Sequence, residues 1–121
     1  GNGIFVAVGN YQKVHTSDNV TTWTQRRNGT VSSYQLYGGG YVNGLYLAVG
    51  GYGAMFGSTD GTTWTTRNTG VTSYDNPLFA VTYGNNTFIV VGYKVILTSP
   101  DGTTWTKYST SLDFQDVISI E

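Results

Sequence analysis

The sequence predicts an all-β fold, a β-propeller of four-stranded antiparallel blades. Two features indicate it. A heptapeptide at Ser58 to Trp64 recurs at Ser99 to Trp105 and, in a looser form, at Ser17 to Trp23. The three tryptophans of the chain end these copies and stand 41 residues apart. A repeat of that length suits a blade of four short strands. No segment has the apolar spacing of a capped helix, so we expect no substantial helix.

Each repeat supplies four strand segments in the same order. An apolar run between glycines, such as Ile4 to Val8, predicts a buried strand. A glycine-containing turn then reverses the chain, one strand leads into the heptapeptide, and another leads out of it. A polar linker follows before the inner strand of the next blade. We expect linkers at 28–34, 68–76 and 109–113, and inner strands at 36–41, 78–83 and 116–120.

The termini suggest how the blades are completed. We expect one domain over residues 1–121, with blade repeats at about 1–41, 42–83 and 84–121. Three blades are too few for a ring, because propellers have roughly four to eight. The hypothesis is a strand-swapped homodimer of six blades, in which residues 116–120 complete the first blade of the partner and cover its apolar edge. The alternative is a fragment of a longer propeller.

The heptapeptide has a structural explanation. An Asp or Asn at the start of a tight hairpin accepts hydrogen bonds from turn amides, Gly supplies a positive φ, and the indole packs beneath the turn. Val20 stands where the other copies have Gly and resists positive φ, so we expect the first copy to be distorted. One carboxylate per copy is too few for a calcium loop. The structural residues are Ser17, Asn19, Trp23, Ser58, Asp60, Gly61, Trp64, Ser99, Asp101, Gly102 and Trp105.

The heptapeptide resembles the Asp-box, or bacterial neuraminidase repeat, and with its surrounding strands the resemblance covers essentially the whole chain. It implies a propeller but no particular activity, because sialidases, sortilin-type receptors and photosystem assembly factors share it. A sialidase needs an arginine cluster and a tyrosine–glutamate pair. Here Glu121 is the single glutamate, and none of the three arginines falls on a predicted inner strand. We therefore expect no sialidase activity.

Composition narrows the remaining chemistry. Only 11% of residues are charged and the net charge is −1, which disfavours nucleic acid as a partner. The chain has no cysteine and one histidine, His15, so we predict no metal site and no cofactor. Asp113 and Asp116 leave a glycoside hydrolase as the catalytic alternative, although turn capping explains them equally well. We expect a non-enzyme that does not insert into membranes and that is extracellular, surface-exposed or virion-associated.

The tyrosines supply the candidate ligand site. Tyr11, Tyr52 and Tyr93 each fall in the turn after the apolar run, and Tyr34 and Tyr74 fall in two linkers. Both kinds of loop should emerge on the face opposite the heptapeptides. Tyrosine offers apolar area with a hydroxyl, which suits sugars and protein loops, although the rings could instead pack loops onto blades. We predict a non-catalytic, lectin-like binding module. The alternative is a self-assembling component of a virion, surface layer or extracellular filament.

Overall fold

The computed structural model describes residues 3–27, 35–71 and 76–113. They form three antiparallel sheets, and no α-helix occurs among them. Two short 3-10 turns, η1 (Asn10–Gln12) and η2 (Gly51–Gly53), connect strands of the first and second sheets. The prediction of an all-β chain is confirmed. The predicted strand at 116–120 and the linker tyrosines Tyr34 and Tyr74 lie outside the described residues.

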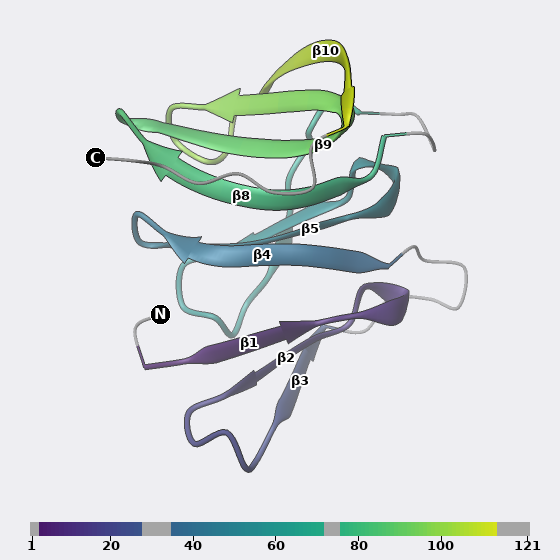
Figure 1. Ribbon diagram of the computed structural model, residues 1–121. Coiled ribbons are helices and arrows are strands. Elements are labelled where there is room, and N and C mark those ends of the chain that lie inside the picture. Colours follow the sequence, from purple (N-terminus) through teal and green to yellow (C-terminus); the bar gives the residue numbers. More distant parts are fainter. Residues whose placement is uncertain (1–2, 28–34, 72–75, 114–121) are drawn as a thin grey trace.

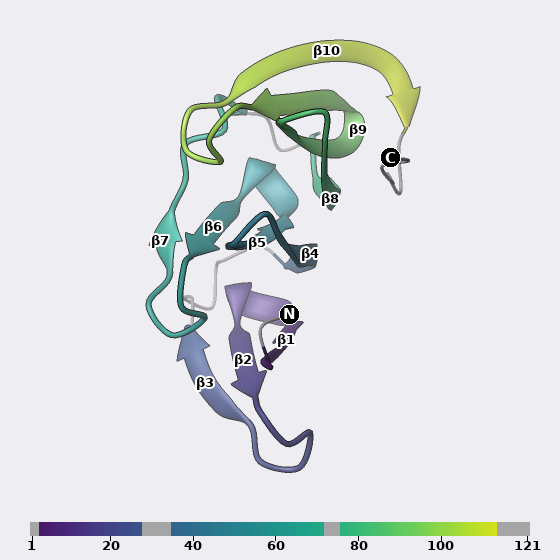
Figure 2. The ribbon, with the colours of Figure 1, turned by 90° about the vertical axis from the view of Figure 1, so that its left-hand side faces the viewer.

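The sheets stack one above another (Figure 1). The first has the order β1 (Phe5–Val8), β2 (Val14–Ser17) and β3 (Thr24–Arg27); the second has β4 (Leu36–Val42), β5 (Leu45–Gly50), β6 (Met55–Ser58) and β7 (Thr65–Thr66); the third has β8 (Leu78–Gly84), β9 (Thr87–Ser99) and β10 (Thr106–Asp113). In the turned view of Figure 2, β1, β4 and β8 follow one edge of the stack, and β3 and β7 follow the other. We call the first of these the β4/β8 edge.

The third sheet differs from the prediction in two places. β9 continues through Gly92, Tyr93 and Lys94, where a separate turn was expected, and Lys94 at the bend has a φ of 61°. The expected linker at 109–113 is wrong, because these residues belong to β10. Ser109 still pairs with Val95, and after a bulge Asp113 pairs with Tyr93. The partner strand therefore keeps this polar segment extended.

The middle sheet is apolar on both faces. All six residues of β5 are buried, and successive side chains of a strand point to opposite faces. Leu45, Leu47 and Val49 join the core shared with the third sheet, whereas Ala48 joins the core shared with the first. Burial on both sides explains why the β5 segment is a continuous apolar run instead of an alternating one.

Glycines of β4 permit a close backbone approach both to β8 of the third sheet and to β5 of the same sheet. A Cβ on Gly38 would collide with the carbonyl oxygen of Phe79 in β8, and a Cβ on Gly39 would collide with that of Leu47. A Cβ on Gly40 would have an ordinary contact of 3.8 Å with Val81 Cγ1. Two of the three consecutive glycines are therefore required by backbone packing.

These contacts distinguish two substitutions in one strand. Gly38→Ala should lower the free energy of unfolding by roughly 1–3 kcal/mol, because the strand must move away from β8. Gly40→Ala should change it by less than about 1 kcal/mol, because its neighbour is an ordinary side-chain contact. Urea unfolding of the two variants measures the difference. Equal losses would show that the approach of β4 to β8 does not limit residue size.

Candidate functional site

The heptapeptides form three tryptophan hairpins, residues 17–23, 58–64 and 99–105, each between two strands. In the second hairpin, Ser58 Oγ accepts the amide of Gly61 at 2.8 Å. Asp60 Oδ1 accepts the amides of Thr62 and Thr63 at 2.8 and 2.9 Å. The third hairpin repeats these three hydrogen bonds at the same distances. The Ser and Asp side chains are thus occupied in holding the turn.

The first hairpin keeps the same geometry. Asn19 Oδ1 accepts the amides of Thr21 and Thr22 at 2.9 and 2.8 Å. Val20 adopts a φ of 70°, close to the 78° of Gly61. The expectation of a distorted first copy is therefore wrong. The side-chain hydrogen bonds determine the turn, and Val20 accepts the backbone strain that follows.

The three indoles differ in their surroundings. Trp23 Nε1 donates to the Val20 carbonyl at 3.0 Å, and Trp64 Nε1 donates to that of Gly61 at 2.9 Å. Trp105 Nε1 is buried and has no hydrogen-bond partner in the part of the chain that the structure describes. Trp64 and Trp105 are half-buried between sheets, whereas Trp23 at the end of the stack is 41% exposed. Trp64 and Trp105 therefore belong to the packing between sheets.

The hairpin carboxylates are perturbed by the turn itself. The amides of Thr63 and Thr62, followed by the Ser58 hydroxyl, lower the pKa of Asp60. The amides of Thr104 and Thr103 lower the pKa of Asp101 in the same way. Both carboxylates are exposed and stand on separate sheets. Their pKa shifts follow from structural hydrogen bonds and do not indicate acid–base chemistry.

Other candidates for chemistry are dispersed. Within the described ranges, no three His, Cys, Asp or Glu side chains gather closely enough to hold a metal ion. Of the carboxylate pair considered for catalysis, Asp113 ends β10 and Asp116 lies outside the described residues. His15 on β2 lines an open cavity of about 470 Å³ together with Trp23 and Ala7. His15 and Asp113 belong to different sheets.

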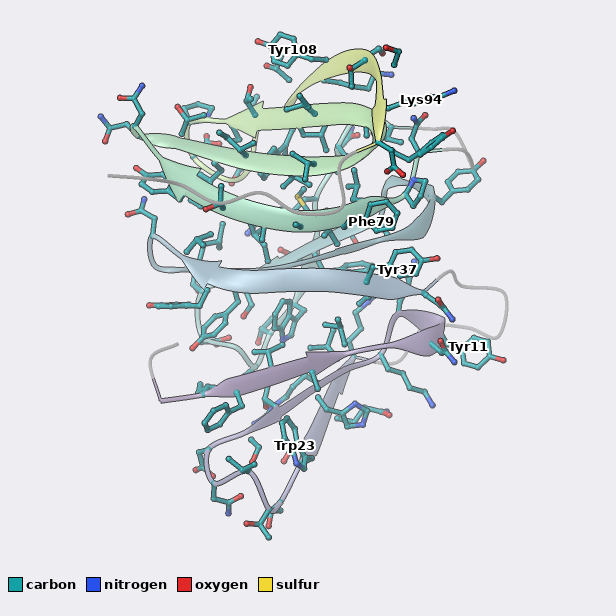
Figure 3. All side chains as sticks on the ribbon, viewed as in Figure 1. Tyr11, Trp23, Tyr37, Phe79, Lys94 and Tyr108 are labelled. Atoms are coloured by element: carbon teal, nitrogen blue, oxygen red, sulfur yellow. The ribbon has the colours of Figure 1, made fainter. Side chains whose placement is uncertain are left out.

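The turn tyrosines lie on the side of the stack where the strands end away from the tryptophan hairpins; we call this side the tyrosine end. Tyr11, Tyr52 and Tyr93 are 44%, 43% and 36% exposed. Figure 3 shows Tyr11 and Lys94, the neighbour of Tyr93, at the same right-hand end. Tyr11 and Tyr52 have φ values of 56° and 59°, in the left-handed region that only a few per cent of non-glycine residues adopt. The strained backbone and exposed ring recur together in the first two sheets.

Two lysines lie over these rings. Lys94 Nζ is 5.1 Å from the centroid of Tyr93, and Lys13 Nζ is 6.0 Å from that of Tyr11. The tyrosine faces therefore accept cation–π contacts within the chain. Tyr52 instead lines an open groove of about 570 Å³ beside η2, which Gln12 and Arg27 also border.

Arg27 serves that groove mainly by packing. Its guanidinium lies 3.7 Å from the ring centroid of Phe56, and Nη2 donates to Gln12 Oε1 at 3.3 Å. Burial lowers the pKa of Arg27, yet an arginine stays charged at any physiological pH. The side chain therefore closes the wall of the groove between the first and second sheets.

The sequence reasoning missed an aromatic pair on the β4/β8 edge. Tyr37 of β4 and Phe79 of β8 have ring centroids 5.5 Å apart, and Tyr37 is 48% exposed. They lie toward the right-hand side of the stack in Figure 3, the side that carries Tyr11. The available clue was an aromatic residue second in both predicted inner strands. What it could not show was that both rings leave the core.

No protein-family model and no curated protein matches the chain. The resemblance to the Asp-box repeat therefore stays a prediction based on the hairpin motifs. No helix among the described residues is long and apolar enough to cross a bilayer.

The hairpin carboxylates predict a pH dependence of stability. A pKa that is lower in the folded state means that the charged form stabilises the fold at neutral pH. That contribution should be lost as the pH falls below about 4, where an unfolded Asp takes up its proton. The variant carrying Asp60→Asn and Asp101→Asn should fold, because Asn19 already supports one hairpin. Its urea midpoint should fall less between pH 7 and pH 3 than that of the unmodified chain. Equal falls would assign the acid sensitivity to other groups.

Proposed function

We propose that the three sheets are blades of an Asp-box β-propeller and that two copies of the chain close a ring of six blades. Support comes from the packing that recurs inside the chain. The first sheet lies on the second through Val14, Ala48 and Phe56, and the second lies on the third through Leu47 and Phe88. β1 faces the second sheet at the first junction, and β5 faces the third sheet at the second junction. Each sheet therefore packs on the next through the same one of its two faces.

One outer face of this stack matches faces that are buried inside it. Phe5 and Trp23 occupy the repeat positions of Tyr46 and Trp64. Tyr46 is 1% exposed because the first sheet covers it, whereas Phe5 is 53% exposed. Trp23 lies at the bottom of the stack in Figure 3. The first sheet therefore presents a surface of the type that this chain buries.

The opposite face supplies the complement. Thr87, Ile89 and Ile96 of β9 occupy the repeat positions of Leu45, Leu47 and Met55, which cover the following sheet. Docking this face onto the first sheet of another copy is a head-to-tail contact, and two such contacts close a ring. The exchanged strand at 116–120 belongs to this proposal and would pair with β1, whose described partner is β2 alone. If the chain is instead a fragment of a longer propeller, it should have the mass of one copy in solution.

A substitution on the exposed end face tests the ring. Trp23→Asp should convert a particle of two copies into one copy, because an unpaired charge in an apolar contact is strongly unfavourable. Tyr11→Ser, in an exposed turn outside the end faces, should keep both copies. Light scattering during size-exclusion chromatography gives the masses. An unmodified chain that is folded and has the mass of one copy would eliminate the ring.

The function that the geometry supports best is non-catalytic recognition of carbohydrate by the tyrosine-bearing end of the ring. The recurrence of an exposed tyrosine at the same repeat position of all three sheets carries this proposal. A positive φ at Tyr11 and Tyr52 costs about 1 kcal/mol or more. Such strain is characteristic of binding surfaces. Tyr34 and Tyr74, which lie outside the described residues, stay predicted members of this surface, which would face an extracellular or virion-surface environment.

The second candidate is a structural role. The exposure of Phe5 and Trp23 on the outer face of the first sheet favours it, because head-to-tail contacts that fail to close produce an open filament. In that case the tyrosine turns pack against other subunits of the assembly, and the chain is a building block of a virion, surface layer or extracellular filament. Both candidates use the same stacking contact and differ in whether the tyrosine end binds a ligand.

A glycan array separates these functions. Immobilised oligosaccharides should bind the assembled protein, and the variant with Tyr52→Ala and Tyr93→Ala should lose most of that signal, about tenfold or more in apparent affinity. Thr104→Ala, on an exposed residue at the hairpin end, is the control and should bind normally. A flat array together with ordered polymers in electron micrographs would contradict recognition and support the structural role.

A further inference from the structure

We propose that Tyr37 and Phe79 form a stacking surface for the apolar face of a neutral sugar ring. This inference rests on the proposed recognition function and deepens it, because it assigns the ligand contact to the β4/β8 edge. The turn tyrosines then border the site. The aromatic pair comes from two neighbouring sheets, so it exists only in the folded stack.

Both rings leave their strands at a β-bulge. In β4, Leu36 pairs with Gly50 and Gly38 pairs with Val49, which leaves Tyr37 as the additional residue. In β8, Leu78 pairs with Gly92 and Ala80 pairs with Val91, which leaves Phe79. A bulge redirects a side chain away from the regular alternation and is common beside binding sites. The same irregularity carries an aromatic residue at the same repeat position twice.

Contacts between the bulges hold the two rings together. Their centroids are 5.5 Å apart and their planes are inclined by 47°, so neither ring covers the other's face fully. Tyr37 is 48% exposed and Phe79 is half-buried. The absence of a side chain at Gly38 lets the Phe79 carbonyl lie directly against β4. The surface is therefore fixed by the backbone before any ligand arrives.

The bulges connect directly to the tyrosine turns. The Gly51 amide donates to the Gln35 carbonyl at 2.8 Å, immediately before β4. The Tyr93 amide donates to the Pro77 carbonyl at 3.0 Å, immediately before β8. Figure 3 shows Tyr37 and Phe79 toward the end where Tyr11 and Lys94 lie. A ligand stacked on the pair would therefore lie next to the proposed recognition surface.

The chemistry around the pair favours a neutral sugar. One face of a pyranose ring consists of C–H groups that pack on aromatic rings, and its hydroxyls need hydrogen-bonding neighbours. Side-chain amides supply these, since Gln35 Nε2 bonds Asn10 Oδ1 and Asn76 Nδ2 donates to the Tyr93 carbonyl. The lysines of this end lie over tyrosine rings. These contacts occupy the lysines within the chain, so the site does not require an acidic sugar.

A peptide strand fits this edge poorly. Strand addition requires a free strand edge with about 4.8 Å of space beside it. β4 and β8 instead approach so closely that even a Cβ at Gly38 would collide with Phe79. A ring that lies flat on exposed aromatics avoids this steric limit.

Calorimetric titration with the strongest neutral oligosaccharide from the array tests the inference. Tyr37→Ala should raise the dissociation constant about tenfold, whereas Tyr37→Phe, which keeps the ring, should change it by about twofold or less. Saturation transfer from protein aromatic protons to the sugar C–H protons should weaken with Tyr37→Ala and persist with Tyr37→Phe. Equal thermal midpoints of the two variants establish that folding is not the cause.

Two results would overturn the inference, and they have different meanings. If Tyr37→Ala binds like the unmodified chain while Tyr52→Ala and Tyr93→Ala weaken binding, the stacking surface is refuted and the recognition function stands. If the unmodified assembly binds no saccharide, the recognition function and the stacking surface are both refuted.

Discussion

The contact on which the structure depends joins the start of one apolar strand to the tryptophan hairpin of the next sheet. Leu45, which begins β5, lies against Gly102 of the third hairpin. Ile4 Cδ1 lies 3.4 Å from the position that a Cβ on Gly61 would occupy. Both glycines have positive φ and carry no side chain, so the side chain of the neighbouring sheet packs directly against the backbone of the turn. The recurrence of the hairpin along the chain therefore sets the stacking of the sheets.

Val20 illustrates the same constraint from the other side. It occupies the glycine position of the first hairpin and is 59% exposed. In the proposed ring, Thr87 of a second copy would take the place that Leu45 and Ile4 take inside the chain. The smaller strand residue would then meet the larger turn residue. The smaller Thr87 would leave room for the larger Val20, so the proposed junction between copies can pack as closely as the internal junctions.

The sequence predicts the local elements of this fold well and its long-range adjustments poorly. Alternation, glycine turns and the spacing of Trp23, Trp64 and Trp105 are local, so the three sheets could be expected from them. The bulges at Tyr37 and Phe79 lie in the pairings of β4 with β5 and of β8 with β9. The two rings meet because β4 packs beside β8, a segment about 40 residues away, and no local pattern encodes that contact. The extension of β10 likewise depends on its partner strand. For this reason the turn tyrosines were identified in advance and the aromatic pair was not.

The direction of stacking between copies is the central claim, and a cross-link measures it directly. Inside the chain, Arg67 Nη1 donates to Thr103 Oγ1 at 3.2 Å, and the equivalent positions across the proposed junction are Tyr108 and Thr21. The chain has no cysteine, so Thr21→Cys and Tyr108→Cys can be introduced cleanly. With a short bis-maleimide, the variant carrying both cysteines should form a covalent product of two copies, and each single variant should stay uncross-linked. A doubly substituted variant that remains a single chain, or single variants that link to themselves, would contradict head-to-tail stacking.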